Sequence, residues 1–313
     1  MLVAHTLLSA GLEPLAASCE IRQGGPDADR ERLLELAAGV DAIVADPTVA
    51  VDDALLEEAG PSLRVVANFA VGYDNIDLEA CRRRDVRVTN TPGVLTDATA
   101  ELALALTLAA ARRMSEAERD LRARRWTGWD PAAYLGLELS GATFGVVGMG
   151  RIGRRYAELV APLAASILYT SRTPKTGPER ELGAVRVDLA ELLAGADVIS
   201  LHIPGTPDAF GLIGRDELRA MRSHAVLVNT ARGPLVDAVA LADALRDGEI
   251  GAAGLDVYER EPQVPAELLD APRCVLLPHI GSATTRARDG MARLVAENVI
   301  AALRGDEPPN RVA

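Results

Sequence analysis

The chain has 313 residues, of which 49% are hydrophobic, so it is long enough to form two domains with buried cores. Only 3% of the residues are aromatic, so these cores must be built mainly from Ala, Leu and Val. The formal net charge of −12 argues against nucleic acid or an anionic membrane as a partner.

The N-terminal stretch and the cysteines indicate the compartment. Met1–Leu15 has no basic leader, and the longest apolar helical run, Leu102–Ala111, is too short to span a bilayer. Cys19, Cys81 and Cys274 show neither disulfide nor metal-ligand spacing, so we expect buried, reduced thiols and no metal site. The sequence predicts a soluble, cytoplasmic protein.

From Leu2 to Asn90, apolar runs alternate with helical patterns, which is typical of a parallel, doubly wound sheet. The predicted strands are Leu2–Leu8, Ala42–Ala45, Val65–Ala67 and Val86–Val88, and the predicted helices are Arg32–Ala38, Asp52–Ala59 and Asp77–Arg84. This part contains no glycine fingerprint. One glycine follows a strand within Phe69–Asp74, where free backbone amides would suit a small carboxylate and an ordinary turn is the alternative.

A break at Thr91–Gly93 is followed by capping residues and by a long Ala/Leu-rich helix, predicted from about Ala98 to Arg119. We interpret this helix as the start of the second domain. The irregular stretch Arg122–Ser140 then carries both tryptophans, Trp126 and Trp129. So much aromatic area favours coverage by a partner subunit, with burial against the chain itself as the alternative.

The stretch Thr143–Lys175 has the pattern of a dinucleotide-binding motif. An apolar run, Phe144–Val147, leads into glycines, then an amphipathic helix, and then a second apolar run, Ile167–Tyr169. The glycines permit a tight turn, close approach of a pyrophosphate, and close packing of the helix on the sheet. The residues of this loop predicted to bind the cofactor are Gly148, Met149, Gly150, Arg151, Ile152 and Gly153.

The end of the second strand indicates which cofactor binds. An NAD site usually has a carboxylate there to hold the ribose, whereas this chain has Ser171, Arg172, Thr173 and, slightly further on, Lys175. A guanidinium and hydroxyl groups suit a 2′-phosphate, which a carboxylate would repel. The sequence therefore predicts NADP, with NAD possible, and a solvated basic turn is the alternative interpretation.

Four later strands each end beside polar residues. The strands are predicted at Val198–Leu201, Ala225–Val228, Ala252–Val257 and Cys274–Leu277, and the polar residues are His202, Thr230–Arg232, Glu259–Glu261 and His279. Ligands of open parallel sheets bind outside the carboxyl ends of the strands, so we expect these residues at the functional edge. A final amphipathic helix is predicted over Arg286–Leu303.

Hydride transfer to a carbonyl needs an acid for the oxygen and a cation for a neighbouring carboxylate. We place His5 in the first strand and His224 at the opposite edge, which leaves His202 and His279 as acids, with spacing slightly favouring His279. The planar fork of Arg232 suits two-point binding of a carboxylate and a carbonyl. A carboxylate from Glu259 or Glu261 would orient the histidine, and the sequence does not separate these two.

Five motifs together resemble the D-isomer-specific 2-hydroxyacid dehydrogenase family. Three lie in the second half of the chain, at Asn229–Gly233, Gly254–Pro262 and Pro278–Thr284. Two more, at Val71–Asp77 and Thr91–Ala103, bring the chain closer to the glyoxylate/hydroxypyruvate reductase branch. The motifs cover nearly the whole chain in the expected order.

The resemblance implies roles for individual residues. Arg232 would bind and polarise the 2-oxo acid, Glu261 would pair with His279, and His279 would donate the proton. The amides of Val71 and Gly72 would hold the substrate carboxylate. Trp129 is a further expected substrate contact, and the tryptophan-bearing segment would reach the partner in a homodimer. Further cofactor contacts are expected at Pro204, Thr230, Ala231, Asp256 and Gly281, with Asp256 at the nicotinamide carboxamide.

The resemblance also implies that the domains are not consecutive. A Rossmann dinucleotide-binding domain, 96–284, would be inserted into a flavodoxin-like substrate domain made of 1–95 and 285–313, both doubly wound. The hinges would lie near Thr96 and Thr284, with the active site in the cleft between the domains. Two positions depart from the family pattern: Ala45–Thr48 replaces a Leu-Leu-Ser/Thr segment near the substrate, and Gly205 replaces a leucine on the adenine-side loop.

The expected activity is reduction of glyoxylate or hydroxypyruvate to the 2-hydroxy acid with NADPH. Another dehydrogenase of the family, of the phosphoglycerate or D-lactate type, is the first alternative. A nucleotide-sensing binding module resembling the family's transcriptional corepressors is the second. Turnover of a panel of 2-oxo acids distinguishes the three.

Overall fold

The computed structural model describes the whole chain, Met1–Ala313, and divides it into two compact units. The first unit consists of Met1–Leu95 and Ser282–Ala313, and the second consists of Thr96–Gly281. Each unit is built on one parallel sheet with helices on both faces, so the predicted α/β class with two doubly wound sheets is confirmed.

The first unit has a five-stranded parallel sheet in the order β2-β1-β3-β4-β5, the order of flavodoxin. Its strands are β1 (Leu2–Val3), β2 (Arg22–Gln23), β3 (Ala42–Ala45), β4 (Val65–Asn68) and β5 (Arg87–Thr89). Its helices are α1 (Ser9–Ala16), α2 (Arg30–Ala37), α3 (Asp53–Ala59), α4 (Leu78–Arg83) and α13 (Thr285–Arg304).

The central strands of this sheet are buried on both faces. In β4, Val66 faces a core shared with α2, α3 and α4, whereas Val65 and Ala67 face a second core shared with α1 and α13. Aspartates begin three of the helices, because Asp29, Asp52 and Asp77 each accept a hydrogen bond from a backbone amide in the first turn of α2, α3 and α4.

The first strand is shorter than predicted. Strand β1 ends at Val3, and Ser9 already begins α1, a helix that the sequence pattern did not indicate because it contains Gly11 and Pro14. The placement of His5 in the first strand is therefore wrong. His5 follows β1, and its Nδ1 atom lies 2.6 Å from Oδ2 of Asp46.

The second unit has a seven-stranded parallel sheet in the order β12-β11-β10-β9-β6-β7-β8, which is a Rossmann order. Its strands are β6 (Ala142–Val147), β7 (Ala164–Thr170), β8 (Val185–Arg186), β9 (Val198–Leu201), β10 (Val226–Asn229), β11 (Ala252–Leu255) and β12 (Cys274–Leu276). Its helices are α5 (Thr96–Ala111), α6 (Met114–Arg122), α7 (Arg151–Val160), α8 (Thr176–Leu182), α9 (Leu189–Gly195), α10 (Arg215–Ala220), α11 (Ala238–Asp247) and α12 (Ala266–Leu269), with short 3₁₀ turns at Pro207–Ala209 and Gly233–Leu235.

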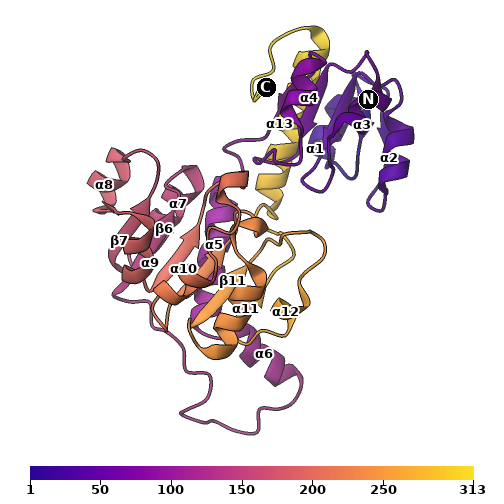
Figure 1. Cartoon of the computed structure of the whole chain (residues 1–313). Coiled ribbons are helices and arrows are strands. Elements are labelled where there is room, and N and C mark those ends of the chain that lie inside the picture. The colour runs from indigo at the N-terminus through magenta and orange to yellow at the C-terminus, as the bar shows by residue number, and fades with distance from the viewer. The chain divides into compact units, whose positions relative to one another are not determined.

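The long helix predicted over Ala98–Arg119 is in fact two helices. The apolar pattern ends at Ala111, and Arg113 has a left-handed backbone with φ 51°. The amide of Leu137 also donates to the Ala111 carbonyl, which a continuous helix would use internally. Helix α6 has no buried residue, and Figure 1 shows α6 and the chain after it extending away from the sheet of this unit.

The structure can be compared with the predictions on cysteine burial and on membrane-spanning helices. Cys81 and Cys274 are buried, and burial raises the pKa of the Cys81 thiol to about 11. Cys19 is half-buried, so the expectation of three buried thiols is wrong at that position. None of the helices combines the length and the apolar character needed to cross a bilayer.

Candidate functional site

The glycine loop follows β6, on whose two sides β7 and β9 pair, so the loop lies where the strand order reverses. In such sheets this switch point is the usual ligand site. Gly148 has φ 98°, and a Cβ atom there would lie 2.6 Å from the carbonyl oxygen of His202. Glycine is therefore required for both the backbone conformation and the space.

The other two glycines differ from each other. A Cβ atom on Gly153 would lie 2.0 Å from the Gly148 carbonyl oxygen, so this glycine allows α7 to pack closely on β6. A Cβ atom on Gly150 would have no atom within 4 Å, which leaves the backbone open to a ligand. Gly150 is the N-cap of the ten-residue helix α7, whose first amides offer hydrogen bonds and a partial positive charge.

The turn after β7 is tightly organised. The Ser171 hydroxyl donates to the Thr173 carbonyl at 2.6 Å, and the Lys175 amide donates to the Tyr169 hydroxyl at 2.8 Å. Arg186 in β8 donates to the carbonyls of Ser171 and Arg172 at 2.9 and 3.3 Å. This arginine adds a third cation beside Arg172 and Lys175, one that the sequence pattern did not indicate.

Three adjacent parallel strands, β10, β11 and β12, bring the charged candidates to one edge of the sheet. Arg232 follows β10, Glu261 follows β11, and His279 follows β12. The Nδ1 atom of His279 lies 2.5 Å from Oε2 of Glu261. We call these three residues the charged cluster. It is Glu261, and not the exposed Glu259, that bonds to the histidine, which separates the two glutamates that the sequence left open.

Electrostatics keeps Glu261 ionised. Burial acts to raise the pKa of its carboxyl, but hydrogen bonds from His279 and from the Tyr258 amide, with the charges of His279 and Arg232, hold that pKa below its usual range. The His279 side chain is 35% exposed, so its ring is neither sealed in the core nor fully in solvent. His279 also has a left-handed backbone with φ 52°, a strained conformation typical of functional sites.

Backbone packing fixes the position of Arg232. The Asn229 side chain accepts a hydrogen bond from the Ala231 amide and donates to the Arg232 carbonyl. A Cβ atom on Gly233 would lie 1.9 Å from the backbone of Tyr258, so only glycine lets this loop pack against the loop that carries Glu261.

Gly205 lies beside Arg232. A Cβ atom there would lie 2.8 Å from Cγ of Arg232. The family pattern connects this position with the adenine-side loop, but its direct neighbour is the stem of the arginine. The missing side chain gives the Arg232 stem its room.

The remaining cofactor candidates lie at the same edge. Asp256 is 1% exposed, and its carboxylate accepts hydrogen bonds from the amides of Ile280 and Gly281, both at 2.7 Å. Burial raises the pKa of the Asp256 carboxyl despite these bonds. The buried Thr230 hydroxyl has no hydrogen-bond partner in the structure, so it is available to a ligand. Together with the open backbone at Gly150, these groups fit a nicotinamide dinucleotide.

His202 and His224 each have protein partners away from the charged cluster. The His202 ring packs on Tyr156 with centroids 5.1 Å apart, and its Nε2 atom lies 2.9 Å from the Ser200 hydroxyl. Desolvation lowers the pKa of His202 to about 3, so the ring is neutral at physiological pH. His224 precedes β10 at the opposite edge, as predicted, and bonds to Asp197 at 2.7 Å.

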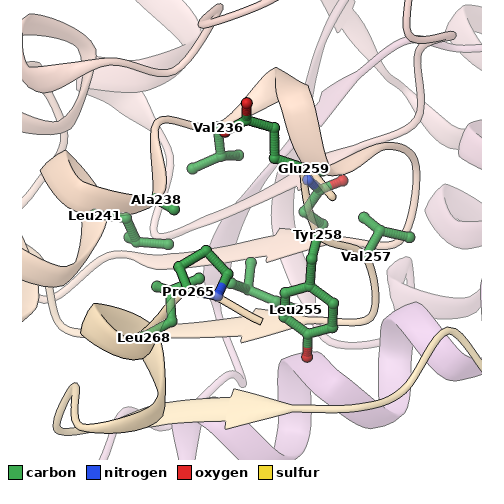
Figure 2. Close-up of a pocket in the computed structure, with 11 residues that line it drawn as sticks. Val236, Ala238, Leu241, Leu255, Val257, Tyr258, Glu259, Pro265 and Leu268 are labelled. Atoms are coloured by element: carbon green, nitrogen blue, oxygen red, sulfur yellow. The ribbon is translucent and has the colours of Figure 1, made fainter. Parts of the chain in front are cut away.

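A small pocket is lined by residues that follow β10 and β11 (Figure 2). Its lining is mostly apolar, and the residues include Val236, Leu241, Leu255, Tyr258 and Leu268. In Figure 2 the Tyr258 ring and the Glu259 side chain leave the backbone in opposite directions. None of the charged cluster lines this pocket, so we interpret it as incomplete packing.

In the first unit, Val71 and Gly72 follow β4 and form a half-buried turn. Neither backbone amide donates to a protein acceptor, so both are available to an anion. The carbonyls of Val71 and Gly72 are both used, by the side chains of Asn90 and Asn68. The two carbonyls are thus occupied, whereas the two amides are not.

The tryptophan-bearing segment is not buried against its own chain. Trp126 is 58% exposed and Trp129 is 84% exposed. Leu121 in α6 and Leu135 further on are also exposed. The alternative of burial within the chain is therefore wrong, and a large apolar surface is left open on this segment.

Comparisons with known proteins agree with these features. The family model "D-isomer specific 2-hydroxyacid dehydrogenase, NAD binding domain" matches residues 104–281. The glyoxylate reductase of Thermococcus litoralis is 51% identical over 284 residues, which cover 90% of this chain and 86% of that protein.

Solved structures give the same picture. A protein from Thermus thermophilus superposes with a TM-score of 0.91 at 43% identity, covering all of both chains. The NADPH-dependent glyoxylate/hydroxypyruvate reductase of Sinorhizobium meliloti, solved with NADP and malonate, superposes with a TM-score of 0.87 at 35% identity. That match covers 100% of this chain and 96% of the other.

Proposed function

Because the chain belongs to the D-isomer-specific 2-hydroxyacid dehydrogenase family, we propose that it reduces glyoxylate or hydroxypyruvate to the 2-hydroxy acid with NADPH. The observation that carries this proposal is the 2.5 Å pair of His279 and Glu261 at the same sheet edge as Arg232. The relatives that act on glyoxylate support a small 2-oxo acid as substrate.

Each residue of the charged cluster has a different role in the proposed reaction. The Arg232 guanidinium binds the 2-oxo acid and polarises its carbonyl, because a planar cation can make two parallel hydrogen bonds. Bound NADPH supplies the hydride that adds to the carbonyl carbon. His279 donates a proton to the carbonyl oxygen from Nε2, since Nδ1 faces Glu261. The ionised Glu261 bonds to Nδ1 and so orients the imidazole for this step.

Two further groups hold the ligands. The amides of Val71 and Gly72 receive the substrate carboxylate. Trp129, on the exposed segment that would reach the partner subunit, is proposed as a further substrate contact. The glycine loop and the first turn of α7 hold the pyrophosphate, with Asp256, Thr230 and Gly281 toward the nicotinamide. The first unit is thus the substrate domain and the second the dinucleotide domain.

The proposed preference for NADPH rests on the turn Ser171–Lys175, which contains no carboxylate. Arg186 donates a hydrogen bond to the Ser171 carbonyl of this turn. Arg172 is exposed, which supports its pairing with a 2′-phosphate, and its charge also acts on Asp208. We expect kcat/KM to be higher with NADPH than with NADH, and Arg172→Ala to reduce the NADPH value selectively. A clear preference for NADH would overturn this assignment. Since NADPH favours reduction, we expect the reaction to run from the 2-oxo acid to the 2-hydroxy acid.

The exposed tryptophan-bearing segment supports a homodimer. Two copies would cover Leu121, Trp126 and Leu135 of each other. Light scattering after size-exclusion chromatography is expected to give twice the chain mass. Replacing Trp126 by Asp would then shift the mass toward the monomer, and a wild-type monomer would refute the proposal.

The central experiment is a panel of 2-oxo acids followed through NADPH absorbance. Glyoxylate or hydroxypyruvate should give the highest kcat/KM. A preference for 3-phosphohydroxypyruvate or pyruvate would indicate another dehydrogenase of the family. Absence of turnover on every acid would favour a binding module that senses the nucleotide.

A further inference from the structure

The Val71–Gly72 turn is held by its carbonyl groups. The Ala70 carbonyl accepts a hydrogen bond from the Thr91 amide at 2.9 Å, and the Val71 carbonyl accepts one from Nδ2 of Asn90 at 2.7 Å. In a planar trans peptide the N–H points opposite to the C=O. A bond that fixes the Val71 carbonyl therefore also fixes the direction of the Gly72 amide, and the Ala70 bond does the same for the Val71 amide.

Asn90 is itself fixed. It is 8% exposed, its amide donates to the Asn310 carbonyl at 3.2 Å, and its carbonyl accepts from the Asn298 side chain at 3.3 Å. Asn298 is completely buried in α13, and its Oδ1 accepts from the Asn310 amide at 3.1 Å. A second side-chain hydrogen bond holds the next peptide, because the Asn68 side chain donates to the Gly72 carbonyl at 2.7 Å.

The hydrogen bond from Asn90 matters because the peptide in such a turn has an alternative orientation. Rotation of the peptide between Val71 and Gly72 would replace the outward N–H by the outward C=O. An anion would then meet a carbonyl oxygen instead of a donor, and the site would repel it. The bond from Asn90 disfavours that rotated state, since the Val71 carbonyl would lose its buried partner.

We propose that Asn90 is a positioning residue for carboxylate recognition, which aims the Gly72 amide at the substrate through the Val71 carbonyl. This inference rests on the proposed function only in taking a 2-oxo acid as the ligand. It assigns the anion selectivity of the first unit to a side chain that does not itself touch the anion.

The test compares Asn90→Ala with Val88→Ala in the full-length protein. Val88 is completely buried in β5, so its truncation destabilises the same sheet without touching the turn. For Asn90→Ala we expect the KM for glyoxylate to rise about five- to tenfold, the effect of one lost hydrogen bond, with little change in kcat or NADPH affinity. For Val88→Ala we expect a lower Tm with an unchanged KM.

A neutral substrate gives the decisive readout. Methyl glyoxylate lacks the carboxylate, so its kcat/KM should fall far less than that of glyoxylate in Asn90→Ala. Equal losses for the acid and the ester, or an unchanged KM for the acid, would overturn the inference. If Asn90→Ala does not fold, Asn90→Ser is measured by the same criteria, because its hydroxyl is too short to reach the Val71 oxygen.

A binding experiment separates this inference from the proposed function. Oxalate, a dicarboxylate that cannot be reduced, is titrated into wild type and Asn90→Ala with saturating oxidised cofactor. If the wild type reduces none of the 2-oxo acids but binds oxalate more tightly than the variant, the proposed function fails and Asn90 keeps its role. Equal oxalate affinities, or none in the wild type, would refute the role of Asn90.

Discussion

The glycine loop after β6 and the charged cluster lie at the carboxyl edge of the same sheet and are built in opposite ways. The loop consists of consecutive residues whose geometry depends on missing side-chain atoms, as the contacts around Gly148 and Gly153 show. The cluster consists of Arg232, Glu261 and His279 from three strand ends, and its centre is a hydrogen bond between two side chains, those of His279 and Glu261.

The two regions therefore respond to different perturbations. A methyl group added at Gly148 or Gly153 should disrupt the loop at any pH, because the clash there is steric. The cluster depends in addition on which of its groups carry protons. Four predictions use this difference, from the largest expected effect to the smallest.

Replacing His279 by Ala removes the proposed acid from the cluster. We expect kcat to fall by about 10²–10⁴-fold, the usual range for a general acid, while NADPH affinity stays near the wild-type value. Steady-state kinetics and fluorescence titration with NADPH measure the two quantities. Near-normal turnover would show that another group donates the proton.

Replacing Gly150 or Gly153 by Ala separates binding from packing within the loop. Gly153→Ala places a Cβ atom 2.0 Å from a carbonyl oxygen, so we expect a loss of about 1–3 kcal/mol in stability. Gly150→Ala meets open space, so its Tm should stay unchanged. Its NADPH Kd should rise about 10–100-fold if a phosphate contact is lost.

These two variants serve as controls for each other. Thermal unfolding without cofactor and NADPH titration are done on both. If Gly150→Ala binds NADPH like the wild type, the phosphates do not approach the backbone there.

Replacing Gly205 by Ala tests how tightly the cluster is positioned. The new Cβ atom would lie 2.8 Å from Cγ of Arg232 and must displace the arginine stem. An off-rotamer side chain costs about 0.5–1.5 kcal/mol, so KM for the 2-oxo acid should rise about two- to tenfold. Gly195→Ala is the matched control, because its Cβ atom meets only Cδ1 of Leu168, at 3.1 Å. Equal KM values in the two variants would contradict the prediction.

The smallest effect is the pH dependence of stability through Glu261. Its carboxyl has a lowered pKa in the folded protein, so its stabilising contribution is present above the ordinary value of 4.5 and is lost as pH falls through the lower folded value. Urea unfolding should therefore show a difference between wild type and Glu261→Gln at pH 7 that shrinks below about pH 4.5. A difference that is constant with pH would mean that Glu261 does not titrate in this way.

The sequence predicted the parts of the fold that depend on local pattern. Strands β3 and β9 have the predicted bounds. The other predicted strands differ from the observed ones by a few residues at one or both ends, and β1 is much shorter than predicted. The break after Ala111 was missed because the amide that takes its carbonyl comes from Leu137, and helical periodicity carries no information about such a contact. Helix α1 was missed because Gly11 and Pro14 weaken its pattern, and packing against α13 overrides that weakness.

The candidate site divides in the same way. The glycine loop consists of consecutive residues, so the amino-acid sequence was enough to recognise it. The partnership of Glu261 rather than Glu259 with His279 depends on the path of the loop after β11, which periodicity does not encode. Arg186 could not be connected with the Ser171 turn, because only the pairing of β7 with β8 brings them together.

The first unit is made of two stretches that are far apart in the chain, and this affects its folding during synthesis on the ribosome. One face of its sheet, with Val3, Val44 and Val65, is covered by α13 residues such as Val295 and Val299. The sheet is therefore translated first, but α1 alone covers part of this face until the last helix emerges. The intervening segment, Thr96–Gly281, is continuous and has cores on both faces of its own sheet, so it can fold before the unit that precedes it is complete.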